Sequence, residues 1–280
     1  MTFDLSHAKH DTAHCLAPGL FQSFKRGDKK GQNYKVIYEY GNNQTLEFYC
    51  FEPLNDIDMR VLQGLVAMSG PSGVILNLHS PKSDPGRELS ILLEPKFETF
   101  EDNALVIKNT FYALAKEIGY KDPNGTRTRN DIKKSIERLW NVSIIARRGS
   151  FKRGFRLLSE YASDEADKRL FVALNPLITE AVLGDRQYTH IKMDEVRALK
   201  TPAARLMHQR LCGFVDIGKK HLTPINIDTL SSYVWVGEGS LEVVKKRRQK
   251  IKKGLKELIA LQWSIEEVTK NNFTIKRPEI

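Results

Sequence analysis

The residues whose type and spacing suggest chemistry most strongly are the basic side chains of one segment near the carboxyl end. From Lys245 to Lys256 the sequence KKRRQKIKKGLK has eight Lys or Arg residues among twelve and no acidic residue. Such a density of like charge would repel itself in an isolated helix, so it favours a partner rich in phosphates. Arg can bind guanine through two hydrogen bonds and Gln can pair with adenine, whereas a merely solvated face usually alternates Glu with Lys. The segment therefore predicts contact with both the backbone and the bases of DNA.

A helix over residues 241–261 would place the apolar and polar side chains of this segment on opposite sides, at about 100° per residue. The apolar side holds Val244, Ile251, Leu255 and Leu258, and the polar side holds Lys246, Gln249, Lys250 and Lys253. We expect the polar side to enter a major groove. The residues of this helix predicted to contact DNA are Lys245, Lys246, Arg247, Arg248, Gln249, Lys250, Lys252 and Lys253. The alternatives are an ordinary solvated face and a membrane-surface helix, which fits worse because the apolar side has no Trp or Phe.

Two further groups of residues are predicted to lie on DNA. The first belongs to a helix in the first half of the chain and to the strands that follow it. Its members are Arg127, Arg129, Lys133, Lys134, Arg138, Arg147, Arg148, Lys152, Arg153 and Arg156. Acidic neighbours dilute the charge of this helix, so we expect the group to hold the DNA backbone more than the bases. The second group is at the tip of the closing hairpin and consists of Lys270, Asn271 and Asn272.

No set of residues predicts an enzyme, a cofactor or a bound metal. Residues 213–220 match the phosphate-loop spacing GxxxxGK, but Lys220 stands where a Ser or Thr would bind magnesium. An origin nickase would need a His-apolar-His pair beside a Tyr nucleophile, and the closest segment, at His79, lacks the first His. Three histidines near Cys15 have no second cluster that would complete a metal site. We therefore expect a protein that acts by binding.

The composition of the chain is consistent with a polyanionic partner. Its 280 residues include 44 Lys and Arg against 34 Asp and Glu, a net charge of +10 that suits nucleic acid or an anionic membrane surface. No apolar run approaches the roughly 18 residues of a membrane helix, and the first residues lack the core of a signal peptide. The three cysteines are scattered without a CxxC pair, so neither a disulfide framework nor a zinc ribbon is expected. We predict a cytoplasmic protein that does not bind a membrane.

The elements that would position the basic residues begin with a β-hairpin at 34–51, where apolar and polar residues alternate around a Gly-Asn-Asn turn. The stretch 71–95 has the Pro and Gly spacing of loops around brief strands. Short strands follow the last predicted helix and continue to residue 178. The periodicity predicts three helices, over 58–68, 110–119 (capped by Thr110) and 131–140. Two helices followed by a hairpin is the order of a winged helix-turn-helix.

The second half of the chain repeats this plan, which suggests a divergent duplication. A strand at 191–193, a helical turn capped by Asp194 and a helix over 203–215 lead to a helix at 229–235 capped by Asp228. The basic helix and the closing hairpin follow. We therefore predict an α+β protein with two winged-helix domains in tandem. Its parts are an amino-terminal extension with a β-hairpin at 1–57, a first domain at 58–185, and a second domain, which contacts most of the bases, at 186–280.

Longer motifs resemble those of a known family, in the same order and nearly from end to end. They are HDTAHCLAPGLF (10–21), LQGLVAM (62–68), ALAKEIG (113–119), ERLWNVSIIA (137–146), GFRLLSEYASDEADKRLFVALNPLI (154–178), MDEVRAL (193–199), HQRLCG (208–213), IDTLSSYVW (227–235) and KRRQ (246–249). The family that they resemble is the RepC replication initiator family of IncQ-type broad-host-range plasmids. The segments 22–53, 71–90 and 217–226 depart from its pattern.

The resemblance implies a bacterial initiator with two winged-helix domains that binds tandem direct repeats, called iterons, in double-stranded DNA at a plasmid origin. It also implies opening of an adjacent A+T-rich segment and work with a plasmid-encoded helicase and primase, while a homodimer is left open. The alternatives are a winged-helix transcriptional regulator that binds an operator, and an enzyme such as a nickase or primase. Tandem repeats beside an A+T-rich stretch favour the initiator, a lone palindrome over a promoter favours the regulator, and nicking or primer synthesis indicates the enzyme.

Overall fold

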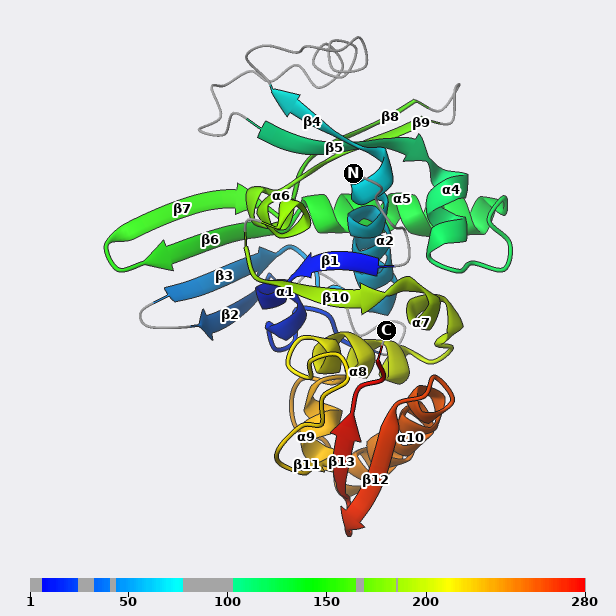
Figure 1. Ribbon diagram of the computed structural model, residues 1–280. Helices are drawn as coiled ribbons and strands as arrows, with labels where there is room; N and C mark the ends of the chain where they lie inside the picture. The colour runs from blue at the N-terminus through cyan, green and yellow to red at the C-terminus, as the bar shows by residue number, and fades with distance from the viewer. Residues whose placement is uncertain are drawn as a thin grey trace.

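The fold is mixed α+β, as predicted. The computed structural model describes residues 7–24, 33–40, 44–77, 103–164, 169–184 and 186–279. The described strands form four small sheets, which Figure 1 shows arranged around and between the helices. Three predicted pieces lie outside the described residues, namely the hairpin turn at 41–43, most of the loops up to residue 95, and the turn at 165–167.

Three helices pack together in the first half of the chain: α2 (Asp56–Ser72), α4 (Phe111–Glu117) and α5 (Thr126–Trp140). The side chain of Thr110 accepts a hydrogen bond from the backbone N–H of Ala113 and caps α4, as predicted. Helix α5 begins at Thr126 rather than at 131, because Gly125 takes the extended conformation of an N-cap and no helix breaker follows. The apolar periodicity of α5 predicts that Ile132, Ile136, Leu139 and Trp140 face the core; the first three are buried, and Trp140 is partly buried.

One four-stranded antiparallel sheet joins the amino-terminal hairpin to the strands after α5. In spatial order its strands are β2 (Tyr34–Tyr40), β3 (Gln44–Cys50), β6 (Ser143–Arg148) and β7 (Phe151–Arg156). The hairpin predicted at 34–51 is therefore confirmed. Figure 1 shows this hairpin and the β6–β7 hairpin pointing in the same direction, away from the helices. The amino-terminal hairpin thus braces β6 along its length.

The other four-stranded sheet lies on the far side of these helices. In spatial order its strands are β4 (Gly73–Asn77), β5 (Asn103–Thr110), β9 (Arg169–Leu174) and β8 (Leu158–Asp164). Helix α6 (Pro176–Leu183) follows β9, where we expected strand structure to continue to residue 178. Asn175 caps it by accepting from the N–H of Ile178, and Pro176 suits the first helical turn. The prediction was wrong because a short apolar run does not distinguish a strand from a buried helix.

The amino-terminal strand lies beside the start of the second half. β1 (His7–Asp11) pairs antiparallel with β10 (Tyr188–Lys192), and α1 (Thr12–Leu16) follows β1. The β1–β10 pair joins the first predicted part to the third, and the β3–β6 pair joins the first to the second. The predicted domain limits remain predictions. Strand pairs connect the parts on either side of these limits.

His10 on β1 is completely buried, and its Nε2 atom makes no hydrogen bond with any described residue. Burial, together with the neighbouring His14, lowers the pKa of His10 from 6.5 to about 4. The folded protein therefore keeps this ring neutral over a pH range in which the unfolded chain takes up a proton. Stability consequently falls as the pH drops from 6.5 towards 4, because the unfolded state binds more protons there.

We expect His10→Gln to abolish about 2 kcal/mol of the decrease in unfolding free energy that the protein shows between pH 7 and pH 5. Urea unfolding at the two pH values measures this difference. The control is His221→Gln, which removes a partly exposed imidazole instead of a buried one. An equal decrease in all three proteins would show that His10 does not carry the effect.

The second half continues from β10 through a helix, a short strand, two helices and a hairpin. Its elements are α7 (Met193–Ala198), α8 (Pro202–Cys212), β11 (Ile225–Asn226), α9 (Ile227–Ser232), α10 (Leu241–Ile259), β12 (Ser264–Thr269) and β13 (Asn272–Lys276). β11 pairs with β13, so the strand order of this sheet is β11, β13, β12. None of the described helices is long and apolar enough to cross a membrane.

Two predicted helix caps are wrong. The side chain that caps α9 belongs to Asn226, which accepts a hydrogen bond from the N–H of Asp228. At α7 no side chain caps the helix, and Asp194 lies inside its first turn. Asp194 and Asp228 are each the second residue of their helix, two positions after the N-cap, where a negative charge still interacts favourably with the amino end of the helix dipole.

Helix α10 approaches α8 closely. A Cβ atom at Gly254 would lie 2.5 Å from Cε of Met207 and 3.2 Å from the backbone N of Ala204, so only glycine fits without displacement. Trp263, which follows α10, is buried with its ring centroid 5.9 Å from that of His208. These contacts fix one side of α10 on α8 and leave the opposite side to the solvent.

Candidate nucleic-acid interface

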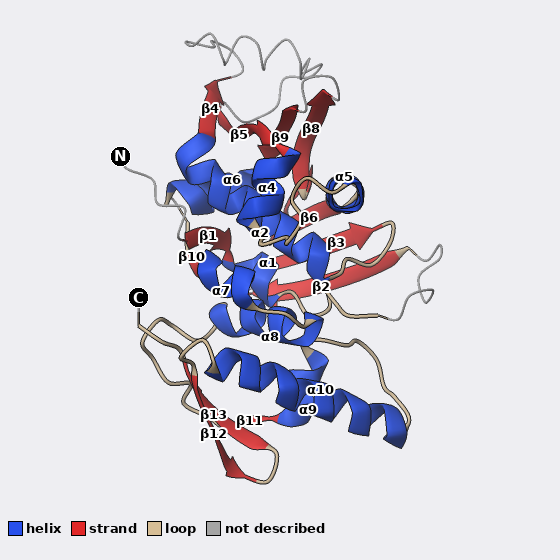
Figure 2. Ribbon diagram, turned by 90° about the vertical axis from the view of Figure 1, so that its right-hand side faces the viewer, coloured by secondary structure: helices blue, strands red, loops and turns tan. Residues whose placement is uncertain are grey.

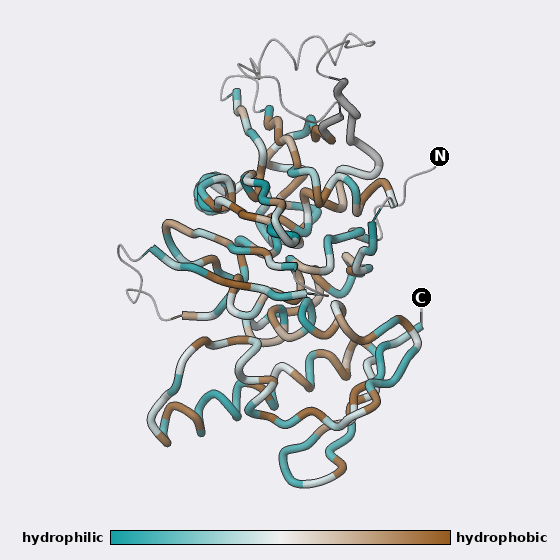
Figure 3. The backbone as a smooth tube through the Cα atoms, turned by 90° about the vertical axis from the view of Figure 1, so that its left-hand side faces the viewer, coloured by the Kyte–Doolittle hydropathy of each residue, from teal (hydrophilic) through white to brown (hydrophobic). Residues whose placement is uncertain are grey.

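Helix α10 has the two sides that its sequence pattern predicts. Ile251, Leu255 and Leu258 are buried, whereas Val244, closer to the start of the helix, is only partly buried. All four residues predicted for the outer side are exposed: Lys246, Gln249, Lys250 and Lys253. Figure 3 shows the first half of this helix, at the lower left, as mostly hydrophilic.

Arg248 of α10 is held by an acidic residue of the preceding helix. Its Nε and Nη2 atoms donate to the two carboxylate oxygens of Asp228, at 2.8 and 2.6 Å. Hydrogen bonding from Arg248 lowers the pKa of Asp228, so this carboxylate is ionised at neutral pH. The paired hydrogen bonds fix the plane of the guanidinium and make Asp228 a positioning residue. We had assigned Asp228 only as a helix cap.

The aromatic ring of Trp235, in the loop before α10, supports two more basic residues. The guanidinium carbon of Arg247 lies 5.7 Å from the ring centroid, and Nζ of Lys250 lies 5.8 Å from it. Arg247 also donates from Nη1 to the backbone oxygen of Gly237 at 2.8 Å. The loop before α10 therefore orients the first basic turns of the helix.

The remaining basic residues of α10 differ in their contacts. Lys246 pairs with Glu242 one turn earlier, and Lys252 lies 3.7 Å from a carboxylate oxygen of Glu267 on β12. Exposed pairs of this kind contribute little to stability and exchange readily for phosphate. Within the described part of the chain, no hydrogen bond or ion pair involves the side chains of Lys245, Gln249 and Lys253.

At the tip of the β12–β13 hairpin, one predicted DNA contact is instead used in hydrogen bonds within the turn. Asn271 has a positive φ of 64°, a conformation that Asn tolerates better than most residues. The side-chain amide of Asn272 donates to Oγ1 of Thr269 and to the backbone oxygen of Lys270, at 3.0 and 3.2 Å. Of the three residues predicted to touch DNA here, Lys270 is exposed, whereas Asn272 is engaged in holding the turn.

The basic residues of α5 fall into two classes. Arg127 and Lys134 are exposed, and Arg129 and Lys133 are partly buried, Lys133 lying 5.6 Å from the ring centroid of Phe111. Arg138, which we placed in the same group, instead binds the fully buried Asp58 of α2. Arg138 therefore holds α5 on α2 and is not available to a phosphate.

On the β6–β7 hairpin, Arg148 and Lys152 are exposed, and Arg153 is partly buried over the ring of Phe155. Arg147 donates from Nε to Glu47 of β3 at 2.8 Å. Hydrogen bonds from Tyr49 and Arg147 lower the pKa of Glu47 to about 2. The amino-terminal hairpin thereby orients Arg147, a contact that spans 100 residues of sequence.

The two basic helices lie on the same side of the molecule. In Figure 2, α5 and the amino-terminal half of α10 are both on the right, together with the β2–β3 hairpin. The β6–β7 hairpin extends from the same sheet as β2–β3. A long rod-like polyanion that runs along this side can therefore contact residues of both halves of the chain.

The sequence did not indicate a polar cluster in the core of the second half. Nε2 of His208 lies 2.6 Å from a carboxylate oxygen of Glu195 and 3.5 Å from Sγ of Cys212, and all three side chains are buried. Two ligands at the usual zinc distances in a tetrahedral site would be about 3.3 Å apart, so a separation of 2.6 Å indicates a direct hydrogen bond. We interpret this group as a set of buried polar contacts that holds α7 against α8. Helix α10 packs on α8 in turn.

Comparison with known proteins identifies a family and a shared fold. A family model described as replication protein C (RepC) matches residues 2–279, which confirms the resemblance found in the sequence motifs. The crystal structure of domains 2 and 3 of RctB is 11% identical with a TM-score of 0.56, over 95% of this chain and 98% of that chain. A second structure of these domains gives 11% identity and a TM-score of 0.51, over 91% and 83% of the two chains.

A structure of the Pi initiator protein in complex with iteron DNA is 13% identical with a TM-score of 0.47, over 79% of this chain and 92% of that chain. No curated protein matches the sequence. At these identities the likeness to RctB shows the fold alone.

Proposed function

Because the chain belongs to the replication protein C family, we propose that it initiates plasmid replication by binding iteron repeats in double-stranded DNA at the origin. The observation that carries the proposal is the outer side of α10, where Lys246, Gln249, Lys250 and Lys253 are exposed on a helix that α8 holds in place. This combination of lysine and glutamine side chains suits phosphates and base edges together.

In this proposal each half of the chain contains a winged-helix domain. Helix α10 lies in a major groove as the recognition helix of the second domain, with β12–β13 as its wing. Helix α5 and the β6–β7 hairpin take the corresponding positions in the first domain and hold the DNA backbone. The order of helices and hairpin in each half supports this assignment.

The later steps of initiation follow from the family resemblance and are part of the proposal. They are opening of an A+T-rich segment beside the repeats and cooperation with a plasmid-encoded helicase and primase in the cytoplasm of the host. If binding to tandem repeats bends the duplex, the cost of that deformation depends on the sequence and is lower at flexible steps such as TA. The proposal also includes that the protein can form a homodimer and that it does not act as an enzyme.

The outer side of α10 is tested by comparing a residue that contacts a base with one that contacts a phosphate. We expect Gln249→Ala to weaken binding to the native repeat by about 1–3 kcal/mol, to relax the preference at one base pair and to leave the salt dependence unchanged. Lys253→Ala should weaken binding to every sequence similarly and lower the slope of log K against log salt by about one unit. Binding to native and singly substituted repeats across a salt titration measures both.

The matched control is Gln187→Ala, an exposed glutamine in the loop before β10, which should bind like the unmodified protein. If Gln249→Ala is neutral on every sequence, the outer side of α10 does not lie in a major groove. If the protein protects a lone palindrome over a promoter rather than tandem repeats, the function is that of a transcriptional regulator.

A further inference from the structure

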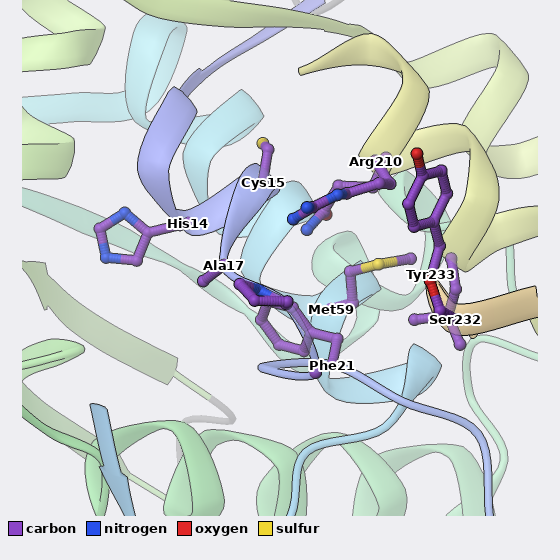
Figure 4. Close-up of a pocket in the computed structure, with 12 residues that line it drawn as sticks. His14, Cys15, Ala17, Phe21, Met59, Arg210, Ser232 and Tyr233 are labelled. Atoms are coloured by element: carbon purple, nitrogen blue, oxygen red, sulfur yellow. The ribbon is translucent and has the colours of Figure 1, made fainter. Parts of the chain in front are cut away.

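A cavity of about 70 Å³ lies where α1, α8 and the end of α9 meet, away from the exposed side of α10. Figure 4 shows Arg210 of α8 extending into it, with Cys15 of α1 near its guanidinium and Tyr233 beside it. Met59 of α2 contributes an apolar wall. The cavity therefore has walls from both halves of the chain.

Two of the three guanidinium nitrogens of Arg210 have no acceptor among the described residues. Its Nε and Nη1 atoms are buried and make no hydrogen bond, and no carboxylate of the described residues pairs with it. The ring of Tyr233, whose centroid is 5.2 Å from the guanidinium carbon, contacts this cation without accepting its N–H groups. Burial lowers the pKa of Arg210, as expected for a cation that lacks a counter-charge.

Other arginines with little exposure do have acceptors. Arg205 donates to Asp56 at 2.9 Å, and Arg277 donates to the backbone oxygens of Cys212 and Val215 at 3.3 and 3.4 Å. Buried donors in folded proteins are nearly always paired, and an unpaired one indicates a water or an ion. The Nε and Nη1 atoms of Arg210 thus mark a place for an acceptor that the described part of the chain does not supply.

We propose that this cavity binds a small oxyanion, inorganic phosphate under cellular conditions, through the guanidinium of Arg210. The Nε–H and Nη1–H groups point away from different edges of the planar guanidinium, so each offers a separate charge-assisted hydrogen bond to an oxygen of such an anion. Since one water needs about 10–15 Å³ of such space, the cavity admits a few waters or one tetrahedral anion but excludes a nucleotide. The bound anion would connect α1, α8 and Tyr233, the residue that ends α9 and begins the loop to α10.

Thermal unfolding of the full chain, in phosphate and in chloride at equal ionic strength, tests the proposal. Arg210→Met should unfold in chloride at the same temperature as the unmodified protein or higher, because it removes a buried charge that has no partner. Phosphate should raise the midpoint of the unmodified protein by about 3 °C more than that of Arg210→Met, and this difference should saturate. Phosphate also stabilises proteins by exclusion from their surface, so the difference between the two proteins is the relevant quantity. The control Lys200→Met, at an exposed lysine, should respond like the unmodified protein.

Phosphorus NMR of inorganic phosphate gives an independent measurement on the unmodified protein. Saturable line broadening with a dissociation constant below about 10 mM, lost in Arg210→Met, is the expected result. Absence of saturable binding, or equal binding by both proteins, would overturn the proposal. A short random duplex at the same phosphate concentration separates the two sources of phosphate. If the duplex alone produces the shift that depends on Arg210, the occupant is the DNA backbone and the free anion is excluded.

Discussion

The variant Asp58→Ala is expected to lose about 3–5 kcal/mol of its free energy of unfolding. Asp58 is 0% exposed, and one of its carboxylate oxygens accepts from Nη2 of Arg138 and from the hydroxyl of Ser135, each at 2.6 Å. The backbone N–H of Asn55 donates to the other oxygen at 2.8 Å. Removal of the carboxylate leaves Arg138 largely buried without its counter-charge, which costs far more than the net stabilisation of the intact pair. Urea unfolding followed by circular dichroism measures the loss.

Two variants make this test specific. Asp194→Ala removes an exposed partner of Arg197 and should cost less than about 1 kcal/mol. Combining Asp58→Leu with Arg138→Met removes both charges and should recover most of the stability lost in Asp58→Ala. If Asp58→Ala is no less stable than Asp194→Ala, the pair does not hold α5 on α2.

The parts of this fold that the sequence predicts well are those governed by local periodicity. Ile251, Leu255 and Leu258 recur at helical spacing, and this spacing alone places them in the core and Gln249 on the solvent side. The hairpins were predictable for the same reason, since alternation and turn residues are adjacent in the sequence. The assignment of these exposed residues to DNA stays a prediction.

The contacts that orient the basic residues were not predictable, because their partners are distant in the sequence. Arg138 and Asp58 are 80 residues apart, and Arg147 and Glu47 are 100 apart. A count of charges therefore assigned Arg138 to DNA, whereas the fold uses it to fix a helix. Predictions of short elements were also wrong, because only a few residues decide the type of element. At α6 the choice of helix over strand depends on the cap Asn175 and on Pro176.

Replacing Arg147, Arg148, Lys152 and Arg153 together with Ala is expected to weaken binding to specific and random DNA alike, by on the order of 10²–10³-fold near physiological salt. The side chains lie on the β6–β7 hairpin, and the backbone contacts proposed for them carry little sequence information. Loss of three or four phosphate contacts should lower the slope of log K against log salt by about three. Titration of fluorescent duplexes with and without the repeat, at several salt concentrations, measures both quantities.

A control with the same change of charge separates these contacts from the net charge of the protein. Four exposed lysines on other elements serve this purpose: Lys116, Lys121, Lys200 and Lys219. Their joint replacement with Ala should reduce binding much less, because none of the four is proposed to contact a phosphate, and exposed charges without a direct contact are strongly screened by salt. Equal losses in both quadruple variants would mean that net charge alone attracts the DNA. If the hairpin variant loses specific binding but keeps its affinity for random duplexes, β6–β7 contacts bases, and the division of labour proposed for the two halves is wrong.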